Sequence, residues 1–291
     1  IYVSATFAGS ITAILINTPG TSAAAATTFD GYPLAQKGEA GRALGVAVIS
    51  STVGGVFSVI VLCFAAPLLA RVAYEFRSPE YFALTVFGLS MLASISAGGA
   101  VKNLIGGIFG VWLSTIGAER VTGIERFMFG NYELYEGLHF VPIFIGLFAI
   151  SELLVQSKTV NKIVNTVSMK AVKLPTKEDY KKIWKTILRS CGIGTFIGVL
   201  PAEGATVASM IGYSEARRWS KNKEEFGKGS IEGIAGAEAA NNSATGGAMV
   251  PTMVLGIPGS GTTAIILVGL MVHGLRPVSY THLRAHETPA N

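Results

Sequence analysis

The stretch that decides the fold reads AANNSATGGAMVPTMVLGIPGSGTTAIILVGLMV and runs from Ala239 to Val272. It contains no charged residue and is interrupted at Gly256-Ile257-Pro258-Gly259. A bilayer core needs about 20 apolar residues in helical conformation. The stretch is therefore long enough for a membrane helix, and its Pro-Gly interruption predicts that the helix is broken at membrane depth, where neighbouring protein must satisfy the freed backbone groups.

Similar uncharged blocks recur along the whole chain. Half of the 291 residues are hydrophobic and only 14% are charged, against about 25% in an average soluble domain. The other apolar blocks are 1–29, 43–70, 81–101, 103–118, 137–151 and 190–214, the last with one charge at Glu203. This composition predicts an all-α, polytopic membrane protein and excludes an ordinary soluble enzyme.

Basic residues are concentrated in two segments. Of the 23 lysine and arginine residues, nine lie in 158–189 and five in 217–228. The positive-inside rule places both segments in the cytoplasm. We attribute the net charge of +5 to this topology. We do not expect a nucleic-acid partner, because we find neither interleaved aromatic residues nor a known binding module.

Two cytoplasmic basic segments require the stretch between them to enter and leave the membrane on one side. Pro201-Ala202-Glu203-Gly204 stands at the middle of that stretch, 190–214. We therefore expect a re-entrant hairpin of two half-helices whose tip is buried in protein or lines a cavity. The alternative is a single kinked span, which would place one basic segment on the outer side.

An internal repeat predicts two related halves. Asn17–Ala25 (NTPGTSAAA) matches Gly256–Ala264 (GIPGSGTTA), and both copies continue through small residues to a closing glycine and proline. Interrupted apolar segments at corresponding places in two halves point to a binding site near the membrane midplane. We predict a first repeat over 1–156 that is truncated at its N-terminus, a basic cytoplasmic loop over 157–189, a second repeat over 190–277 and a non-native tail over 278–291.

The Pro-Gly breaks are the predicted substrate sites. A helix that begins after such a break offers unpaired backbone N–H groups and the positive end of its dipole to an anion. The predicted carboxylate-binding residues are Asn17, Thr18, Pro19, Gly20, Thr21 and Ser22 at the first break, Gly204 and Thr206 at the hairpin, Asn241 and Asn242, and Pro258, Gly259, Ser260, Thr262 and Thr263 at the second break. The alternative is that these small residues only let helices pack closely.

Glu238 is the acidic residue that stands out, because it opens the long uncharged stretch. On a helix, Asn241 and Asn242 follow it by three and four residues and share its face. These three side chains predict a site for a coupling cation, sodium or a proton; the alternative is a carboxylate at a helix start near the membrane interface. We expect no metal site, no other cofactor and no catalytic residue, because the apolar blocks hold no Ser/His/Asp or Cys/His set.

Taken together, the motifs resemble the large membrane subunit of the tripartite tricarboxylate transporters, the TctA family. The resemblance rests on TAILINTPG (12–20), DGYP (30–33), RFMFG (126–130), GLFAISE (146–152), FGKG (226–229), EAANN (238–242) and LGIPGS (255–260). It implies a multi-pass permease subunit of the bacterial inner membrane for the uptake of tricarboxylates or related carboxylates. A periplasmic solute-binding protein, a small membrane subunit and an ion gradient are the implied partners and driving force. An intramembrane enzyme and an anion channel are the alternatives.

Overall fold

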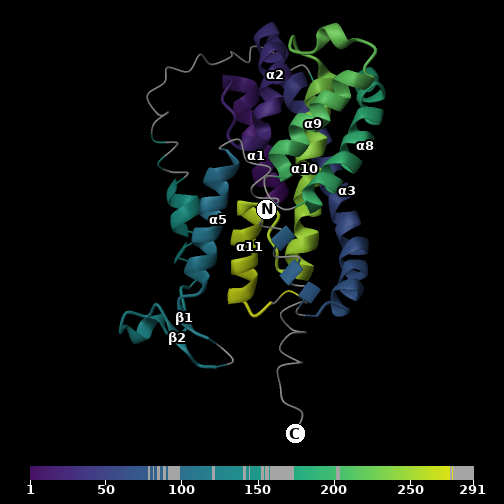
Figure 1. Cartoon of the computed structure of the whole chain (residues 1–291). Coiled ribbons are helices and arrows are strands. Elements are labelled where there is room, and N and C mark those ends of the chain that lie inside the picture. The colour runs from purple at the N-terminus through teal and green to yellow at the C-terminus, as the bar shows by residue number, and fades with distance from the viewer. Residues whose placement is uncertain are drawn as a thin grey trace. The chain divides into compact units, whose positions relative to one another are not determined.

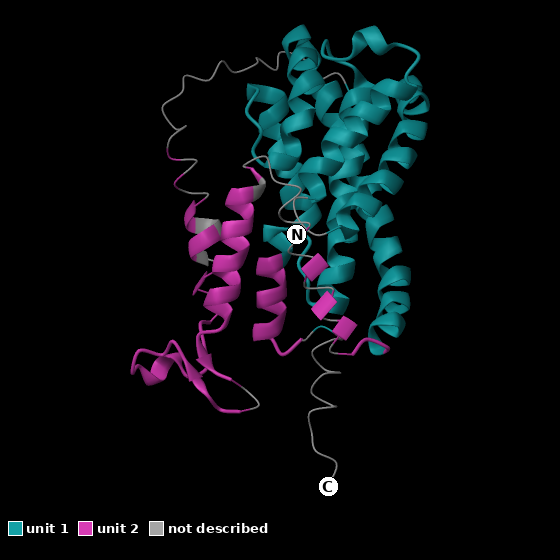
Figure 2. Cartoon of the chain, in the orientation of Figure 1, with its two compact units in different colours: residues 1–74, 163–263, 276–291 teal, residues 75–162, 264–275 magenta. Residues whose placement is uncertain are grey.

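The fold is described from a computed structural model of the chain. It describes residues 1–77, 99–119, 122–139, 145–151, 174–200 and 204–275, together with 79–80, 82–83, 86–87, 90, 142–143, 154, 157 and 277. The chain divides into two compact units (Figure 2). Unit 1 comprises 1–74, 163–263 and 276–291, and unit 2 comprises 75–162 and 264–275. These units cut across the predicted repeats, so the division into two repeats stays a prediction.

The described part of unit 1 is helical almost throughout. Its helices are α1 (Tyr2–Ile16), α2 (Ala25–Leu34), α3 (Ala40–Tyr74), α8 (Lys177–Val199), α9 (Gly204–Trp219) and α10 (Ile231–Leu255). Short turns join them: the 3-10 turns η1 (Ser22–Ala24) and η5 (Lys223–Glu225), and the π-helical turn η2 (Ala35–Glu39).

One helical run among the described residues, Ser22–Tyr74, is long and apolar enough to cross a membrane. It is bent at Gly38, whose φ of 79° lies in the left-handed region that glycine adopts without strain. Shorter apolar helices are α1, Val101–Ser114 and Gly261–Val272. Most of the predicted block 81–101 lies outside the described residues, and repeated crossing of the membrane stays a prediction.

Helix α10 lies at the centre of unit 1, where it contacts α1, α2, α3, α8 and α9 (Figure 1). Every residue from Ile231 to Ala248 is buried. A helix with neighbours on all sides needs small side chains so that the other backbones can approach. Glycine, alanine and serine make up most of this stretch, which explains why its sequence lacks the one-sided apolar stripe of a surface helix.

Helices α8 and α10 approach each other through glycines. A Cβ atom added at Gly194 would collide with the carbonyl oxygen of Ala240, and one at Gly198 would collide with that of Ala244. From the other side, a Cβ atom at Gly247 would collide with the Thr195 carbonyl oxygen. The two backbones are therefore in direct contact from Gly194 to Gly198 of α8 and from Ala240 to Gly247 of α10.

The start of α8 is fixed to α3 by an ion pair. Thr176 and Asp179 form a capping box, in which each side chain accepts a hydrogen bond from the backbone N–H of the other. The Asp179 carboxylate also accepts hydrogen bonds from the Arg42 guanidinium, with 3.0 Å between Nε and Oδ2. Hydrogen bonding to Arg42 holds the pKa of Asp179 below its usual range. Residues 177–189 of the predicted basic loop are thus helical, because the capping box starts α8 at Lys177.

The N-terminus of α10 is held by Asp30 of α2. This buried carboxylate accepts hydrogen bonds from the backbone N–H groups of Gly229 and Ser230, both at 2.8 Å. Lys37 adds a hydrogen bond from Nζ to the Lys228 carbonyl oxygen at 2.6 Å. The DGYP and FGKG motifs of the sequence are therefore in contact, and together they set where α10 begins.

The two Pro-Gly breaks have the same local structure. Helix α1 ends at Asn17 with φ 53°, and α10 ends at Gly256 with φ 72°. In the first break, the N–H groups of Asn17 and Thr18 both donate to the Thr12 carbonyl oxygen. In the second, those of Gly256 and Ile257 donate to the Pro251 carbonyl oxygen. Left-handed caps of this kind satisfy the last carbonyl groups of a helix.

The predicted hairpin corresponds to α8 and α9, which are separate helices and pack against each other. Its tip residues Pro201, Ala202 and Glu203 lie outside the described residues, as does the predicted tail 278–291. That the hairpin re-enters the membrane stays a prediction.

Unit 2 contains α5 (Ala100–Ser114), the 3-10 turn η3 (Tyr132–Leu134), the π-helical turn η4 (Ile145–Ile150) and most of α11 (Gly261–Val272). It also has a short antiparallel ladder of β1 (Gly117–Ala118) and β2 (Glu125–Arg126), with Gly117 opposite Arg126. This ladder departs from the predicted all-α fold, but it involves only two residues on each strand.

The glycine contacts predict an unequal response of α8 to alanine. Gly194→Ala places a methyl group against the α10 backbone, and overpacking of this kind costs about 1–3 kcal/mol. Gly192→Ala is the matched control, because a Cβ atom there meets no neighbour and alanine favours the helix by roughly 1 kcal/mol. We expect the thermal unfolding midpoint in detergent to fall for the first variant and to hold or rise for the second. Equal midpoints would contradict the direct backbone contact.

Candidate functional site

The candidate site is centred on Glu238, in the first half of α10. Its side chain has no exposed surface. Ser10 of α1 donates a hydrogen bond to Oε1 at 2.6 Å, and Thr27 of α2 donates to the same oxygen. Ser51 of α3 donates to Oε2 at 2.8 Å. Three helices other than its own thus direct a hydroxyl group at this one carboxyl group.

The electrostatics of this arrangement are unusual, because all three donors are neutral. Removing a carboxylate from water costs several kcal/mol, which hydrogen bonds offset only in part. The ion pairs among the described residues are Arg42 with Glu39 and Asp179, Lys182 with Glu225, and Arg218 with Glu215, and none includes Glu238. A proton on the carboxyl group or a cation beside it would supply the missing positive charge.

Asn241 and Asn242 are fully buried next to this carboxyl group. Asn241 Nδ2 donates to the Ala23 carbonyl oxygen at 3.3 Å, and Asn242 Nδ2 donates to the Glu238 carbonyl oxygen at 3.1 Å and to Asn241 Oδ1 at 2.6 Å. Asn242 Oδ1 is buried without a hydrogen-bond donor in the described part of the chain, and so is Ser50 Oγ. The group is therefore rich in oxygen atoms that could accept a proton or coordinate a hard cation.

The first break lies close to this buried group. Asn17, Thr18, Pro19, Gly20 and Ser22 are exposed, and Thr21 is half-buried. Thr206, in the first turn of α9, donates a hydrogen bond to Ser22 Oγ at 2.9 Å. Ala23, the next residue, is the one whose carbonyl oxygen binds Asn241. The structure thus brings together three of the predicted sets: the first break, the start of α9 and the α10 asparagines.

The second break lies elsewhere. Ser260 Oγ is 3.1 Å from the hydroxyl group of Tyr2, at the start of α1. The first break instead folds back onto the middle of α1, where Gly20 N–H donates to the Gly9 carbonyl oxygen at 3.0 Å. A Cβ atom at Gly259 of the second break would stand 3.2 Å from the Gly198 carbonyl oxygen, at the end of α8. The two breaks therefore contact different parts of α1, and the second one adjoins the end of α8.

Two residues of the second break are also hydrogen-bonded to each other. Thr263 N–H donates to Ser260 Oγ at 3.2 Å, and Ser260 N–H donates to Thr263 Oγ1 at 2.8 Å. These two hydrogen bonds use backbone N–H groups at the start of α11 that were predicted to bind the substrate carboxylate. Thr262 is exposed and Pro258 is half-buried, whereas Gly259 is buried.

The glycines of both breaks and of the hairpin have a packing role. A Cβ atom at Gly20 would stand 2.9 Å from both Gly9 Cα and Thr12 Oγ1, and one at Gly259 would stand 2.9 Å from Ala248 Cβ. At Gly204, it would stand 3.2 Å from Gly198 Cα. Close helix packing, the alternative reading of these positions, is therefore supported, and bulky replacements there would test the fold rather than anion binding.

Sequence reasoning missed the three hydroxyl residues that contact Glu238. Ser10, Thr27 and Ser51 lie on three different helices and are far from Glu238 in the sequence. Their one sequence signal is a hydroxyl group inside an uncharged block, which many other residues share. Among the described residues, no group of three or more His, Cys, Asp or Glu side chains is placed to hold a metal ion.

Comparisons with known proteins found one family and two relatives. The family described as "Tripartite tricarboxylate transporter TctA family" matches residues 1–281. An uncharacterized 52.8 kDa protein in the TAR-I ttuC′ 3′ region of Agrobacterium vitis is 42% identical over 279 residues, which cover 95% of this chain and 55% of that protein. An uncharacterized protein in the TAR-II ttuC′ 3′ region of the same organism is 43% identical over 84 residues, 29% of this chain and 35% of that protein. The chain spans about half the length of the first relative, and no solved structure matches it.

The hydroxyl cluster predicts that neighbouring residues of α3 differ in their effect on stability. Ser51→Ala removes a buried donor to the Glu238 carboxyl group, and we expect it to lower the free energy of unfolding by about 1.5–3 kcal/mol. Thr52→Ala is the control, since Thr52 is exposed and its hydroxyl group donates to its own helix at Val48; we expect a change within about 0.5 kcal/mol. Denaturant unfolding of the purified chain measures both, and similar losses would show that the Ser51 hydrogen bond contributes little.

Proposed function

The chain belongs to the tripartite tricarboxylate transporter TctA family, and on this premise we propose that it acts as an integral membrane permease subunit of a secondary transporter. The proposed substrates are tricarboxylates or related carboxylates, delivered by a periplasmic solute-binding protein. A small membrane subunit is the second proposed partner, and the proposed location is the bacterial inner membrane, which the chain crosses several times. An ion gradient drives the uptake.

The observation that carries the proposal is the buried carboxyl group of Glu238 among neutral donors. Coupling to an ion gradient requires a group whose charge is balanced in one state of the transport cycle and not in another. Glu238 is suited to this role, because its three hydrogen-bond donors carry no charge and none of the ion pairs in the described part of the chain includes it. Ionisable groups at membrane depth mark ion pathways in other transporters.

Sodium and a proton are both compatible with this group. A proton needs only the Glu238 carboxylate. Sodium needs several oxygen ligands, and the surrounding hydroxyl groups together with Asn242 Oδ1 supply that chemistry. The choice between them is an outcome of the uptake experiment below.

The first break is the proposed substrate position. Residues Asn17 to Gly20 are exposed, and the hydroxyl groups of Ser22 and Thr206 lie together beside them. The backbone N–H groups of Asn17, Thr18 and Gly20 already donate to carbonyl oxygens of α1, so the hydroxyl groups are the proposed donors to the substrate. The hydrogen bond from Asn241 to the Ala23 carbonyl oxygen joins this position to the Glu238 group. Substrate bound at Ser22 and an ion bound at Glu238 would therefore both affect the position of Ser22 and Ala23. The second break, Pro258–Thr263, would be a separate position along the path.

Glu238→Gln tests the coupling. Glutamine keeps the size and most of the hydrogen bonding of glutamate but cannot carry its negative charge. In proteoliposomes that contain the whole transporter, we expect uptake to lose its dependence on the ion gradient, while the substrate concentration for half-maximal uptake changes less than about threefold. Glu224→Gln is the matched control, because Glu224 is exposed. Gradients of sodium at constant pH, and of pH at constant sodium, identify the ion.

The same experiment separates the alternatives. A channel would let the carboxylate equilibrate but not accumulate, and an enzyme would change it chemically. Unaltered ion dependence in Glu238→Gln would make Glu238 a structural residue and place the ion site elsewhere.

Ser22→Ala and Thr206→Val test the substrate position. Each removes an exposed or half-buried hydroxyl group without enlarging the side chain. If these hydroxyl groups donate to the substrate carboxylate, the substrate concentration for half-maximal uptake should rise about five- to tenfold, the effect of losing roughly 1–1.5 kcal/mol. Thr52→Val, at an exposed hydroxyl group on α3, should leave it unchanged. An unchanged value in all three variants would remove Ser22 and Thr206 from the site.

A further inference from the structure

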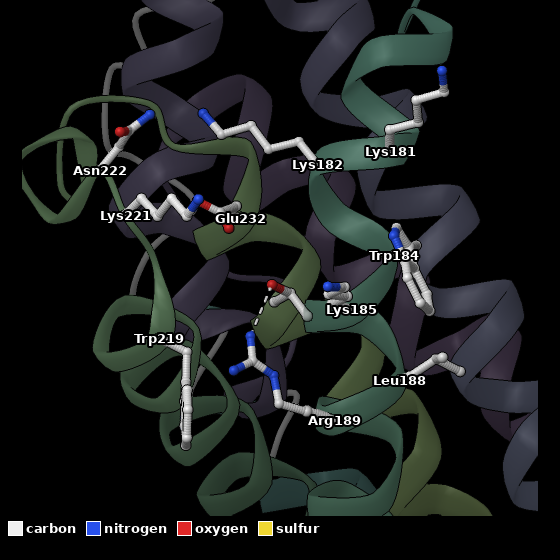
Figure 3. A pocket seen from close by; sticks show the side chains of 11 residues that line it. Lys181, Lys182, Trp184, Lys185, Leu188, Arg189, Trp219, Lys221, Asn222 and Glu232 are labelled. Atoms are coloured by element: carbon white, nitrogen blue, oxygen red, sulfur yellow. Dashed lines mark hydrogen bonds between the residues drawn. The ribbon is translucent and has the colours of Figure 1, made fainter.

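A basic groove lies between the first half of α8 and the segment that leads from α9 into α10 (Figure 3). Its volume is about 910 Å³. Lys181, Lys182, Lys185 and Arg189 line it from α8, and Lys221 lines it from the opposite side. This groove shares no residue with the Glu238 group, and the proposed transport mechanism does not use it.

The positive charge of the groove is only partly neutralised. Lys182 pairs with Glu225 at 3.1 Å. Glu232 also lines the groove, but its carboxylate is almost completely buried and accepts a hydrogen bond from Ser220. Arg189 donates one long hydrogen bond of 3.4 Å to Thr186. The ion pairs of the described residues include none of Lys181, Lys185, Arg189 and Lys221. Of these bases, Arg189 interacts with Glu215 beyond ion-pair distance.

Exposed aromatic side chains flank these bases. Trp184 and Trp219 are 50% and 63% exposed. Lys185 Nζ lies 5.6 Å from the centre of the Trp184 ring, and the Arg189 guanidinium lies 5.2 Å from that of Trp219. Aromatic side chains therefore accompany the bases here, contrary to the expectation from sequence that none is interleaved with them.

The groove also lies where α8 and α9 change from charged to uncharged sequence. Beyond Arg189, α8 carries no charge up to its end at Val199, and α9 carries none from Gly204 to Ser214. Tryptophan residues gather where hydrocarbon meets water in membrane proteins, and lysine and arginine gather at the phosphate groups just outside. The two tryptophans and the bases of the groove lie where both helices change from charged to uncharged sequence. We therefore expect the groove to lie at the depth of the lipid headgroups.

We propose that this groove binds the phosphate group of an anionic phospholipid between Lys185 and Arg189. Trp184, Trp219 and Leu188, which is 50% exposed, would lie against the glycerol and upper acyl chains. A soluble anion would use the bases but would leave these three apolar surfaces in water. The proposal requires that the chain lies in a membrane, and it does not depend on transport.

Tryptophan fluorescence tests the proposal directly, because two of the three tryptophans line the groove. In a Trp112→Phe background, all remaining emission comes from Trp184 and Trp219. The purified chain is placed in nanodiscs of equal amounts of phosphatidylglycerol and phosphatidylcholine, with bromine, a contact quencher, on the acyl chains of one lipid at a time. We expect stronger quenching when phosphatidylglycerol carries the bromine.

The double variant Lys185→Gln/Arg189→Gln should weaken this preference about fivefold for each base removed. Lys185→Arg/Arg189→Lys should retain it. Lys177→Gln/Lys223→Gln removes the same charge from exposed positions outside the groove and should also retain it. Thermal unfolding midpoints confirm that all variants are folded.

Three results would overturn the proposal. The preference for phosphatidylglycerol could persist in Lys185→Gln/Arg189→Gln. It could fall equally in Lys177→Gln/Lys223→Gln, which would indicate a general charge effect. Millimolar inorganic phosphate or citrate could abolish it, which would identify the groove as a site for soluble anions.

Discussion

The carboxyl group of Glu238 is buried because hydroxyl groups from α1, α2 and α3 meet it at one level of α10. Each hydrogen bond to a charged group contributes about 1.5–3 kcal/mol, so three of them offset part of the several kcal/mol that burial of the carboxylate costs. This contribution requires that all three helices keep their positions. The small residues around α10 follow from the same requirement, because four helices cannot reach one buried group unless their backbones approach closely.

The contacts at the edges of unit 1 serve this arrangement by fixing the position of α10 along its axis. A shift of one residue would move Glu238 by about 1.5 Å along the axis and rotate it by about 100° away from the hydroxyl groups. Asp30 prevents such a shift at the N-terminus of α10, through the amides of Gly229 and Ser230. The glycine contacts with α8 prevent it further along, and α8 is itself attached to α3 through Asp179 and Arg42.

Local features of the fold could be predicted from sequence, whereas relations between distant segments could not. The ends of α1 and α10 at Asn17 and Gly256 follow from Pro-Gly chemistry, and the shared face of Glu238, Asn241 and Asn242 follows from helical periodicity. The start of α8 at Lys177 does not follow from the density of charge, which indicates a loop, although Thr176 and Asp179 have the spacing of a capping box. The partners of Glu238 and the separation of the two breaks depend on how helices pack, and one sequence contains no signal for that.

The order of residues in the hydroxyl cluster has a consequence for biosynthesis. Ser10, Thr27 and Ser51 all leave the ribosome long before Glu238. In a membrane helix each of them costs little before Glu238 arrives, since a serine or threonine hydroxyl group can donate to a carbonyl oxygen of its own helix. Glu238 has no such substitute, and an acidic residue within a membrane helix, which we propose α10 to be, costs about 3 kcal/mol. On that proposal, α10 inserts more favourably beside earlier helices that already offer the three hydroxyl groups, so the carboxyl group at the proposed coupling site would also act as a checkpoint on assembly.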